Sequence, residues 1–343
     1  MKKENATSLF FLTRSLFFGL GISLICKYTD KDTYIGAIIG TILGLMIILC
    51  YRYIIKHKMG SLNDLFSKNK VVGMTTRILL LLASIIILIY SLLTYKTFVS
   101  SFLLDTTPVF MILIPWLLLL IYCAWGGISM IHKVSSALFP LSIVLSLLSI
   151  ASIFGNFDFY NFLPILTSKS GNMFMTIIAF ASISAFPGLL TLHLNKDTKN
   201  YIRYYLLGAL SIVIVILCIN GVFGEVLVNV FRFPEYMVLK QVKLFDFIEK
   251  IENILSIAWA FDLFITSSFA LYSIKTLGPS KHNTLFTILT LGIAGILIDK
   301  FFDFNYVYEL VAYYALPYIS LALPIIIILL MFYLVKKRNR SKL

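Results

Sequence analysis

Long apolar runs alternate with short polar segments along almost all of the 343 residues. A helix that crosses the hydrocarbon core of a bilayer needs ~20 mostly apolar residues, and the runs have about this length. We therefore expect an all-α integral membrane protein in which residues 1–343 form a single polytopic domain. The pattern predicts ten spans, near residues 8–25, 33–55, 78–103, 108–125, 130–154, 172–193, 202–221, 251–274, 283–299 and 308–335.

Composition favours a membrane protein over a soluble one. Hydrophobic residues make up 59% of the chain and charged residues 13%, and the mean hydropathy is +0.93. So few polar side chains cannot cover the surface of a soluble globule. The lipid bilayer is therefore the expected surrounding of most of the chain.

The formal net charge of +13 has a topological explanation. The basic residues lie in short runs between the apolar spans and form no continuous face, so we expect no nucleic-acid partner. Most of them fall in segments that are cytoplasmic if the amino terminus is inside, as the positive-inside rule describes. Because the number of predicted spans is even, both termini are expected in the cytoplasm.

The sequence contains no pattern typical of an enzyme or a metal site. Motifs of metalloproteases, serine hydrolases and phosphate-binding loops are absent, and the histidines and acidic residues show no ligand spacing. The cysteines are scattered and form no CxxC pair. We expect no enzymatic activity, no metal and no cofactor. The four cysteines are Cys26, Cys50, Cys123 and Cys218.

Two spans contain residues that interrupt a helix. Residues 17–22 read Phe-Phe-Gly-Leu-Gly-Ile near the centre of the first span, and paired glycines weaken a helix. A broken helix would expose backbone groups that can bind a small zwitterion at mid-membrane, whereas close helix packing explains the glycines equally well. The sixth span contains Ser-Ile-Ser-Ala-Phe-Pro-Gly at 182–188. Interruptions five spans apart predict a five-plus-five inverted repeat, about 8–154 and about 172–335, with broken helices 1 and 6.

Two ionisable residues well inside predicted spans are candidates for function, because a charge costs ~2.5–3.5 kcal/mol at a helix centre. They are Arg14 and Asp262, and Asp262 is followed one turn later by Thr266, Ser267 and Ser268. These groups could form an ion or proton site. Alternatively, Asp262 forms a structural ion pair with Arg14 and the hydroxyls bond to their own helix backbone.

The segment 222–250 mixes apolar and charged residues and is too polar to span the membrane. Its apolar positions recur every three residues, which favours an amphipathic helix at the outer interface or a packed loop helix. These positions are Tyr236, Leu239, Val242, Phe245 and Ile248.

Several stretches together resemble the B subunits of spore germinant receptors, which form the spore permease family of the amino acid–polyamine–organocation superfamily. The resemblance covers essentially the whole chain. It is carried by Phe-Arg-Phe-Pro-Glu-Tyr-Met-Val-Leu-Lys at 231–240, Phe-Asp-Phe-Ile-Glu-Lys-Ile-Glu at 245–252, Asn-Phe-Leu-Pro-Ile-Leu at 161–166 and Gly-Leu-Gly at 19–21.

The resemblance implies a LeuT-type fold and a subunit that senses a small nutrient germinant, often an amino acid. It also implies that the subunit lies in the inner spore membrane beside an A-type membrane subunit and a C-type lipoprotein subunit. By this resemblance Gly19, Leu20 and Gly21 would line the germinant pocket, and by position Ser182, Ser184 and Phe186 would face them. The chain departs from the family pattern because it has Arg14 in the first span and no acidic residue in the sixth.

Two other functions remain open at this point. A secondary amino-acid transporter could couple uptake to H⁺ or Na⁺ through Asp262 with Thr266, Ser267 or Ser268. A passive assembly scaffold would keep only a vestigial pocket. The segment 222–250 favours the receptor, because a plain transporter does not need a family-specific external helix.

Overall fold

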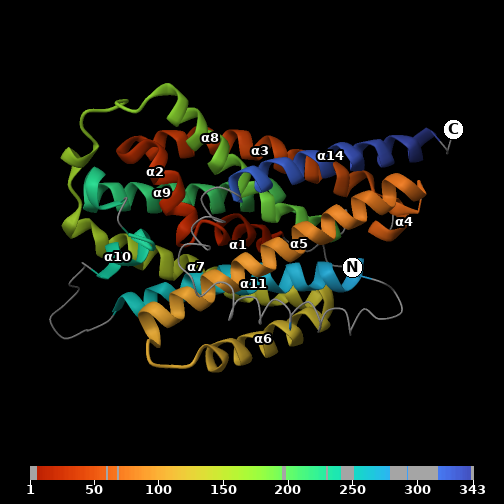
Figure 1. Ribbon diagram of the computed structural model, residues 1–343, viewed down its shortest axis with the longest axis horizontal. Coiled ribbons are helices and arrows are strands. Elements are labelled where there is room, and N and C mark those ends of the chain that lie inside the picture. The colour runs from red at the N-terminus through yellow and green to blue at the C-terminus, as the bar shows by residue number, and fades with distance from the viewer. Residues whose placement is uncertain are drawn as a thin grey trace.

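The computed structural model is a bundle of long helices lying roughly side by side, with short helices at its ends (Figure 1). Every described element with regular structure of three residues or more is helical. The structure describes residues 6–58, 61–67, 69–194, 198–228, 231–240, 251–278, 292 and 316–340.

The first predicted span consists of two helices, α1 (Thr7–Ser15) and α2 (Leu20–Thr29). A one-turn 3₁₀ helix, η1 (Asp30–Asp32), joins α2 to α3 (Thr33–His57). The next elements are α4 (Leu62–Phe66), α5 (Lys70–Phe98) with the π-helical η2 (Val99–Leu103), α6 (Val109–Trp125), and α7 (Gly127–Ile153) with the 3₁₀ helices η3 (Phe154–Asn156) and η4 (Phe159–Phe162). They are followed by α8 (Ser170–Ala185), the 3₁₀ helix η5 (Phe186–His193), α9 (Tyr201–Val228), α10 (Pro234–Lys240), α11 (Ile251–Leu277) and α14 (Leu316–Arg340).

The predicted spans match helices wherever the structure describes them, although some ends differ. Seven described helices are long and apolar enough to cross a membrane, and Val109–Trp125 is a shorter apolar helix. Helix α5 begins at Lys70 and not near residue 78, because its first two turns mix apolar with polar and charged residues and a hydropathy pattern does not register them. Helix α9 likewise continues past residue 221 to Val228. The predicted span 283–299 lies outside the described residues.

Helix α1 forms the centre of the bundle. All nine of its residues are buried, and it packs against α7, α8, α9, α11 and η5. A helix that is covered on every side can carry apolar residues all round, which the sequence Leu-Phe-Phe-Leu at 9–12 does. The interruption after α1 is therefore enclosed by protein and does not face lipid.

A row of glycines on α3 allows α8 to approach closely. A methyl group built on Gly40 would lie 2.8 Å from Cβ of Phe180, and one on Gly36 would lie 2.5 Å from Cγ2 of Thr176. Small residues four apart let helix backbones meet in membranes, where lipid provides little drive for association. The spacing of Gly36, Gly40 and Gly44 thus fixes the α3–α8 contact.

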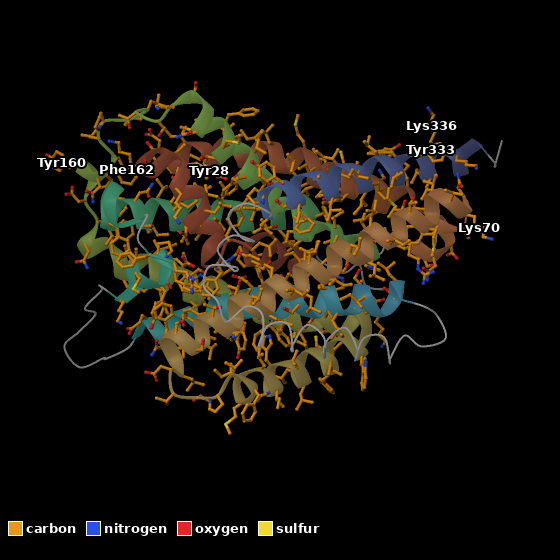
Figure 2. The ribbon with its side chains drawn as sticks, viewed as in Figure 1. Tyr28, Lys70, Tyr160, Phe162, Tyr333 and Lys336 are labelled. Atoms are coloured by element: carbon orange, nitrogen blue, oxygen red, sulfur yellow. The ribbon has the colours of Figure 1, made fainter. Side chains whose placement is uncertain are left out.

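The two ends of the bundle carry tyrosine and lysine side chains (Figure 2). The labelled residues Tyr28, Tyr160 and Phe162 lie at one end, and Lys70, Tyr333 and Lys336 lie at the other. Aromatic and basic side chains concentrate where a membrane protein meets the lipid headgroups. The long axis of the bundle therefore corresponds to the membrane normal.

The described part of segment 222–250 packs into the bundle. Helix α9 bends at Gly224, whose φ is 63°, and α10 then lies against α2, α7, α9 and α11. Tyr236 and Leu239, two of the apolar positions in the predicted pattern, are 2% exposed. Residues 234–240 thus correspond to the packed loop helix and not to a helix lying in the interface; Val242, Phe245 and Ile248 lie outside the described residues.

Candidate ligand site at the interrupted first span

Between α1 and α2 the chain leaves helical geometry for four residues. Gly19 has φ 72° and ψ −116°, a conformation that side-chain-bearing residues rarely adopt. Gly21 is required for a different reason, because a methyl group there would lie 2.1 Å from the carbonyl oxygen of Leu16. Gly19 therefore permits the positive φ of the interruption, and Gly21 permits the close approach of the Leu16 carbonyl oxygen.

Side chains from distant helices bind the backbone groups that the interruption leaves free. The hydroxyl of Tyr90 on α5 donates to the carbonyl oxygen of Leu16 at 3.3 Å. The amide of Gly19, at the amino end of α2, donates to carboxyl oxygen Oε1 of Glu235 on α10. Because α10 belongs to segment 222–250, Glu235 connects that segment directly to the interrupted helix.

An aromatic cluster covers the interruption. Phe18, beside Gly19, packs its ring 4.9 Å from Phe98, 5.4 Å from Phe233 and 4.8 Å from Trp259, measured between centroids. Phe102 contacts Phe233 at 5.5 Å in an edge-to-face geometry. Such pairs contribute ~0.5–1.5 kcal/mol each beyond the area they bury. The cluster joins α5, α10 and α11 around the start of α2.

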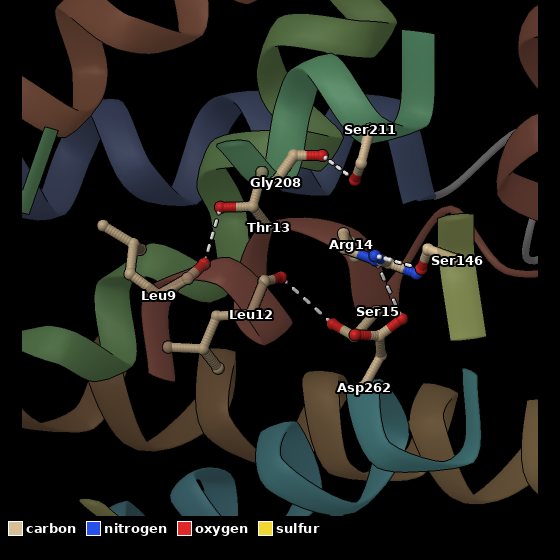
Figure 3. A network of polar contacts seen from close by, with 9 residues as sticks. All are labelled: Leu9, Leu12, Thr13, Arg14, Ser15, Ser146, Gly208, Ser211 and Asp262. Atoms are coloured by element: carbon tan, nitrogen blue, oxygen red, sulfur yellow. Dashed lines mark hydrogen bonds and ion pairs between the residues drawn. The ribbon is translucent and has the colours of Figure 1, made fainter. Parts of the chain in front are cut away.

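The charged residues of α1 and α11 meet one turn before the interruption. Nε of Arg14 lies 3.1 Å from Oδ2 of Asp262, and both side chains are 2% exposed. Nη1 of Arg14 also donates to the hydroxyl of Ser146 on α7 at 3.3 Å, as Figure 3 shows. Removing one partner of a buried pair costs ~3–5 kcal/mol, because the other charge is then left without compensation. The pair therefore holds α1, α7 and α11 together.

The hydroxyls that follow Asp262 on α11 are buried. Within the described part of the chain, the hydroxyls of Thr266 and Ser267 and the Oδ1 atom of Asp262 have no hydrogen-bond partner. The hydroxyl of Ser268 also has no hydrogen-bond partner among the described residues. The structure thus brings Asp262 to Arg14 and leaves three neighbouring hydroxyls without a described partner.

A cavity of about 40 Å³ lies beside Arg14, between α1, α7, α9, α10 and α11. Its polar wall contains two buried charged groups and three hydroxyls, and its apolar wall includes Trp259 and Leu239. A site needs ~10–15 Å³ on this measure to hold one water, so the cavity holds only a few waters in this closed form. The polar residues are Arg14, Ser146, Ser149, Ser211 and Glu235.

Glu235 has only one of its two carboxyl oxygens in a hydrogen bond to another described residue. Its second carboxyl oxygen, Oε2, is buried and has no partner among the described residues. Helix α10 is not one of the membrane-spanning helices. Burial raises the pKa of Glu235, and because this effect exceeds the opposing effect of the hydrogen bond from Gly19, the pKa is about 8. Glu235 is therefore mostly uncharged at neutral pH while the cavity is empty.

The structure separates the other predicted site residues from this cavity. Ser182 and Ser184 lie within α8, which continues to Ala185 before the 3₁₀ helix η5 begins. The hydroxyl of Ser182 meets Ser320 of α14 at 3.1 Å, and that of Ser184 meets Tyr205 of α9 at 3.1 Å. Phe186 is fully buried. None of these three residues lines the cavity, and neither do the glycines of the interruption.

Sequence reasoning missed most of the cavity wall. Ser146, Ser149 and Ser211 are small polar residues in long apolar helices, where serine is common and has no distinctive spacing. Glu235 lies in the segment 231–240 that carries the family resemblance, but no pattern in that segment distinguishes it as a binding residue. The available signal for its burial was an acidic residue within a short apolar pattern, since Phe233, Tyr236 and Leu239 surround it on α10.

The fold and site define an integral membrane protein with a cavity, lined by buried ionisable residues, beside an interrupted central helix. The chain belongs to the spore permease family of spore germination proteins, whose sequence pattern matches residues 5–298. This is a non-enzymatic family. No curated protein matches the chain in sequence.

Among solved structures, the chain is similar to two variants of a manganese transporter from Eremococcus coleocola. The similarity to a His-to-Ala variant has a TM-score of 0.49 and 12% identity, and covers 94% of this chain and 75% of the transporter. A Glu-to-Gln variant gives a TM-score of 0.48 with the same identity and coverage.

Proposed function

We propose that this chain is the membrane subunit of a spore germinant receptor that binds a small nutrient germinant, in particular an amino acid, and thereby triggers germination. Family membership supports a role in germination. The observation that carries the binding function is the cavity beside an interrupted helix whose wall contains two buried ionisable side chains, Arg14 and Glu235. Buried charges without a full set of partners are costly and mark functional sites in membrane proteins.

The cavity has to enlarge when a germinant binds. Its volume of about 40 Å³ admits a few waters, whereas an amino acid needs several times that space. A ligand changes a conformational equilibrium only by binding one state more tightly than the other. The closed structure is then the resting state, and the germinant stabilises a state in which the cavity is larger.

The surroundings of the subunit form part of the same proposal. The helices adopt a LeuT-type arrangement with two inverted repeats, and both termini lie in the cytoplasm. The subunit acts in the inner spore membrane with an A-type membrane subunit and a C-type lipoprotein subunit, which transmit the conformational change. Family membership and the apolar spans support these statements.

A coupled transporter is the second candidate function. It is favoured by the unpartnered hydroxyls of Thr266 and Ser267 beside Asp262 on α11. The ion pair with Arg14 argues against it, because a cation that binds Asp262 would have to compete with a guanidinium 3.1 Å away. The receptor therefore remains the better-supported function.

Germination and uptake assays separate the two functions. We expect that deleting the gene abolishes germination of spores in response to at least one amino acid, and that the wild-type gene restores it. Purified protein in proteoliposomes should not accumulate that amino acid. Accumulation that Asp262→Asn abolishes would establish transport, and unchanged germination of the deletion strain towards all nutrients would contradict the receptor.

A further inference from the structure

Arg14 and Glu235 reach the cavity from different elements and are among its most buried side chains. Arg14 comes from α1 and is 3% exposed, and Glu235 comes from α10 and is 2% exposed. The remaining polar groups of the wall are three serine hydroxyls, the thiol of Cys218 and the indole N–H of Trp259, none of which carries a formal charge. The hydroxyls of Ser149 and Ser211 donate to carbonyl oxygens of their own helices, at 2.9 Å and 2.7 Å. The two charged residues are therefore the groups that can recognise a ligand.

Arg14 offers hydrogen-bond donors beyond those already in use. A guanidinium group carries five N–H donors in a planar fork. Asp262 accepts from Nε and Ser146 accepts from Nη1. Such a fork binds a carboxylate at two points, and a buried guanidinium does so without competition from water.

Glu235 offers one acceptor to the cavity. Oε1 is bound by the amide of Gly19, while Oε2 has no partner in the described ranges. A buried acceptor without a partner costs ~1–3 kcal/mol. A cationic donor from a ligand would remove this cost and stabilise the ionised carboxylate. An ammonium group, with three donors and no acceptor, is the matching chemistry.

We propose that Glu235 binds the ammonium group of the amino acid and that Arg14 binds its carboxylate. This inference rests on the proposed function, since it assigns the chemistry of the same cavity. The apolar wall formed by Trp259 and Leu239 receives the side chain of the amino acid and favours a small, apolar one. Because Glu235 also binds Gly19, a single carboxyl group connects the ligand's ammonium to the interrupted helix.

Binding experiments on the full chain in lipid nanodiscs test this assignment. Each standard amino acid is first screened by its effect on thermal unfolding, and the affinity of the best binder is measured by calorimetry. Its deaminated analogue, which keeps the carboxylate, and its decarboxylated analogue, which keeps the amine, are measured next. For the wild type we expect each analogue to bind at least 10-fold more weakly than the amino acid.

The variant Glu235→Gln removes the negative charge and keeps both the size and an acceptor for the Gly19 amide. It should weaken binding of the amino acid at least 10-fold and leave the affinity of the deaminated analogue unchanged. Asp105→Asn makes the same charge change at an exposed position and should behave as the wild type. Equal loss of affinity for both ligands in Glu235→Gln would overturn the ammonium assignment, as would no loss at all.

The wild-type measurements keep the inference open to refutation if Glu235→Gln does not fold. A deaminated analogue that binds the wild type as tightly as the amino acid would overturn the role of Glu235, and an equally tight decarboxylated analogue would overturn that of Arg14. A wild type that binds no amino acid would instead refute the proposed function itself. The two failures are therefore distinguishable.

Discussion

The substitution Gly19→Ala changes the interruption of the first span at its most restricted residue. Alanine would have to adopt φ 72° and ψ −116°, which costs of order 1–3 kcal/mol for a residue with a side chain. The new methyl carbon would also lie 2.5 Å from Cε1 and 2.9 Å from Cδ1 of Phe233. Both effects act on the same few atoms, at the contact between α2 and α10.

The ring of Phe233 has little room to move away. It is 1% exposed and packs against Phe18, Phe98 and Phe102. Overpacking of this kind costs ~1–3 kcal/mol, so Gly19→Ala should destabilise the closed state by about 2–6 kcal/mol in total. Even ~2 kcal/mol on one of two states changes their ratio about 30-fold. The resting conformational equilibrium of the protein should therefore be lost.

The assay compares spores that carry Gly19→Ala with spores that carry Gly171→Ala. Gly171 lies in the first turn of α8, where an added methyl group meets nothing within 4 Å, so this control should germinate as the wild type does. We expect Gly19→Ala spores to lose the normal nutrient dependence of germination at equal protein level, checked by immunoblot. Wild-type germination rates in Gly19→Ala spores would refute the role assigned to the interruption.

Three further predictions concern stability in nanodiscs. Asp262→Asn leaves the charge of Arg14 buried and should destabilise the protein by ~3–5 kcal/mol, seen as a lower apparent Tm; an unchanged Tm would mean that the ion pair is solvated. Glu235, with its pKa raised to about 8, stabilises the fold fully below about pH 4.5, and this contribution falls by ~1.4 kcal/mol per pH unit up to about pH 8. The apparent Tm of the empty protein should thus drop between pH 6 and pH 8, and Glu235→Gln should remove this part of the drop; identical profiles would contradict it. Gly40→Ala should lower the Tm because its methyl group meets Phe180 at 2.8 Å, whereas Gly155→Ala meets nothing within 4 Å and should not; equal effects would refute the close α3–α8 contact.

The charged groups around Glu235 do not alter the sign of this pH dependence. Arg14 on α1 shares the cavity but is paired with Asp262 of α11. The cavity wall from α7 contains only serine among polar residues, and that from α9 adds Cys218. Glu235 is therefore the group in this cavity whose charge changes between pH 6 and pH 8.

Hydropathy predicts where helices cross the membrane because burial in lipid requires long apolar runs. Hydropathy does not predict how far a helix extends beyond the apolar core of the membrane, and so the start of α5 at Lys70 was missed. It also cannot separate a surface helix from a packed one when both are amphipathic. For α10 the decision depends on α9 bending at Gly224, a tertiary feature that returns the chain to the bundle.

The candidate site was only partly accessible from sequence. The interruption at Gly19 leaves a local signature, and so does an isolated charge such as Arg14 or Asp262 in an apolar span. The cavity itself depends on which faces of α7, α9 and α10 turn towards α1, and helical periodicity does not determine this. Ser182 and Ser184 illustrate the limit, since a Pro-Gly pair that begins three residues after Ser184 suggested a break, while the helix continues through both serines.

The most direct test of the central claim is amino-acid binding to the purified chain with and without an obstruction in the cavity. In Ser149→Phe a ring replaces a half-buried hydroxyl on the cavity wall and should occupy the space of about 40 Å³. We predict saturable binding of one small amino acid to the wild type and at least 10-fold weaker binding to Ser149→Phe at a similar apparent Tm. Equal affinities of the two proteins would contradict the account, because the ligand would then bind elsewhere.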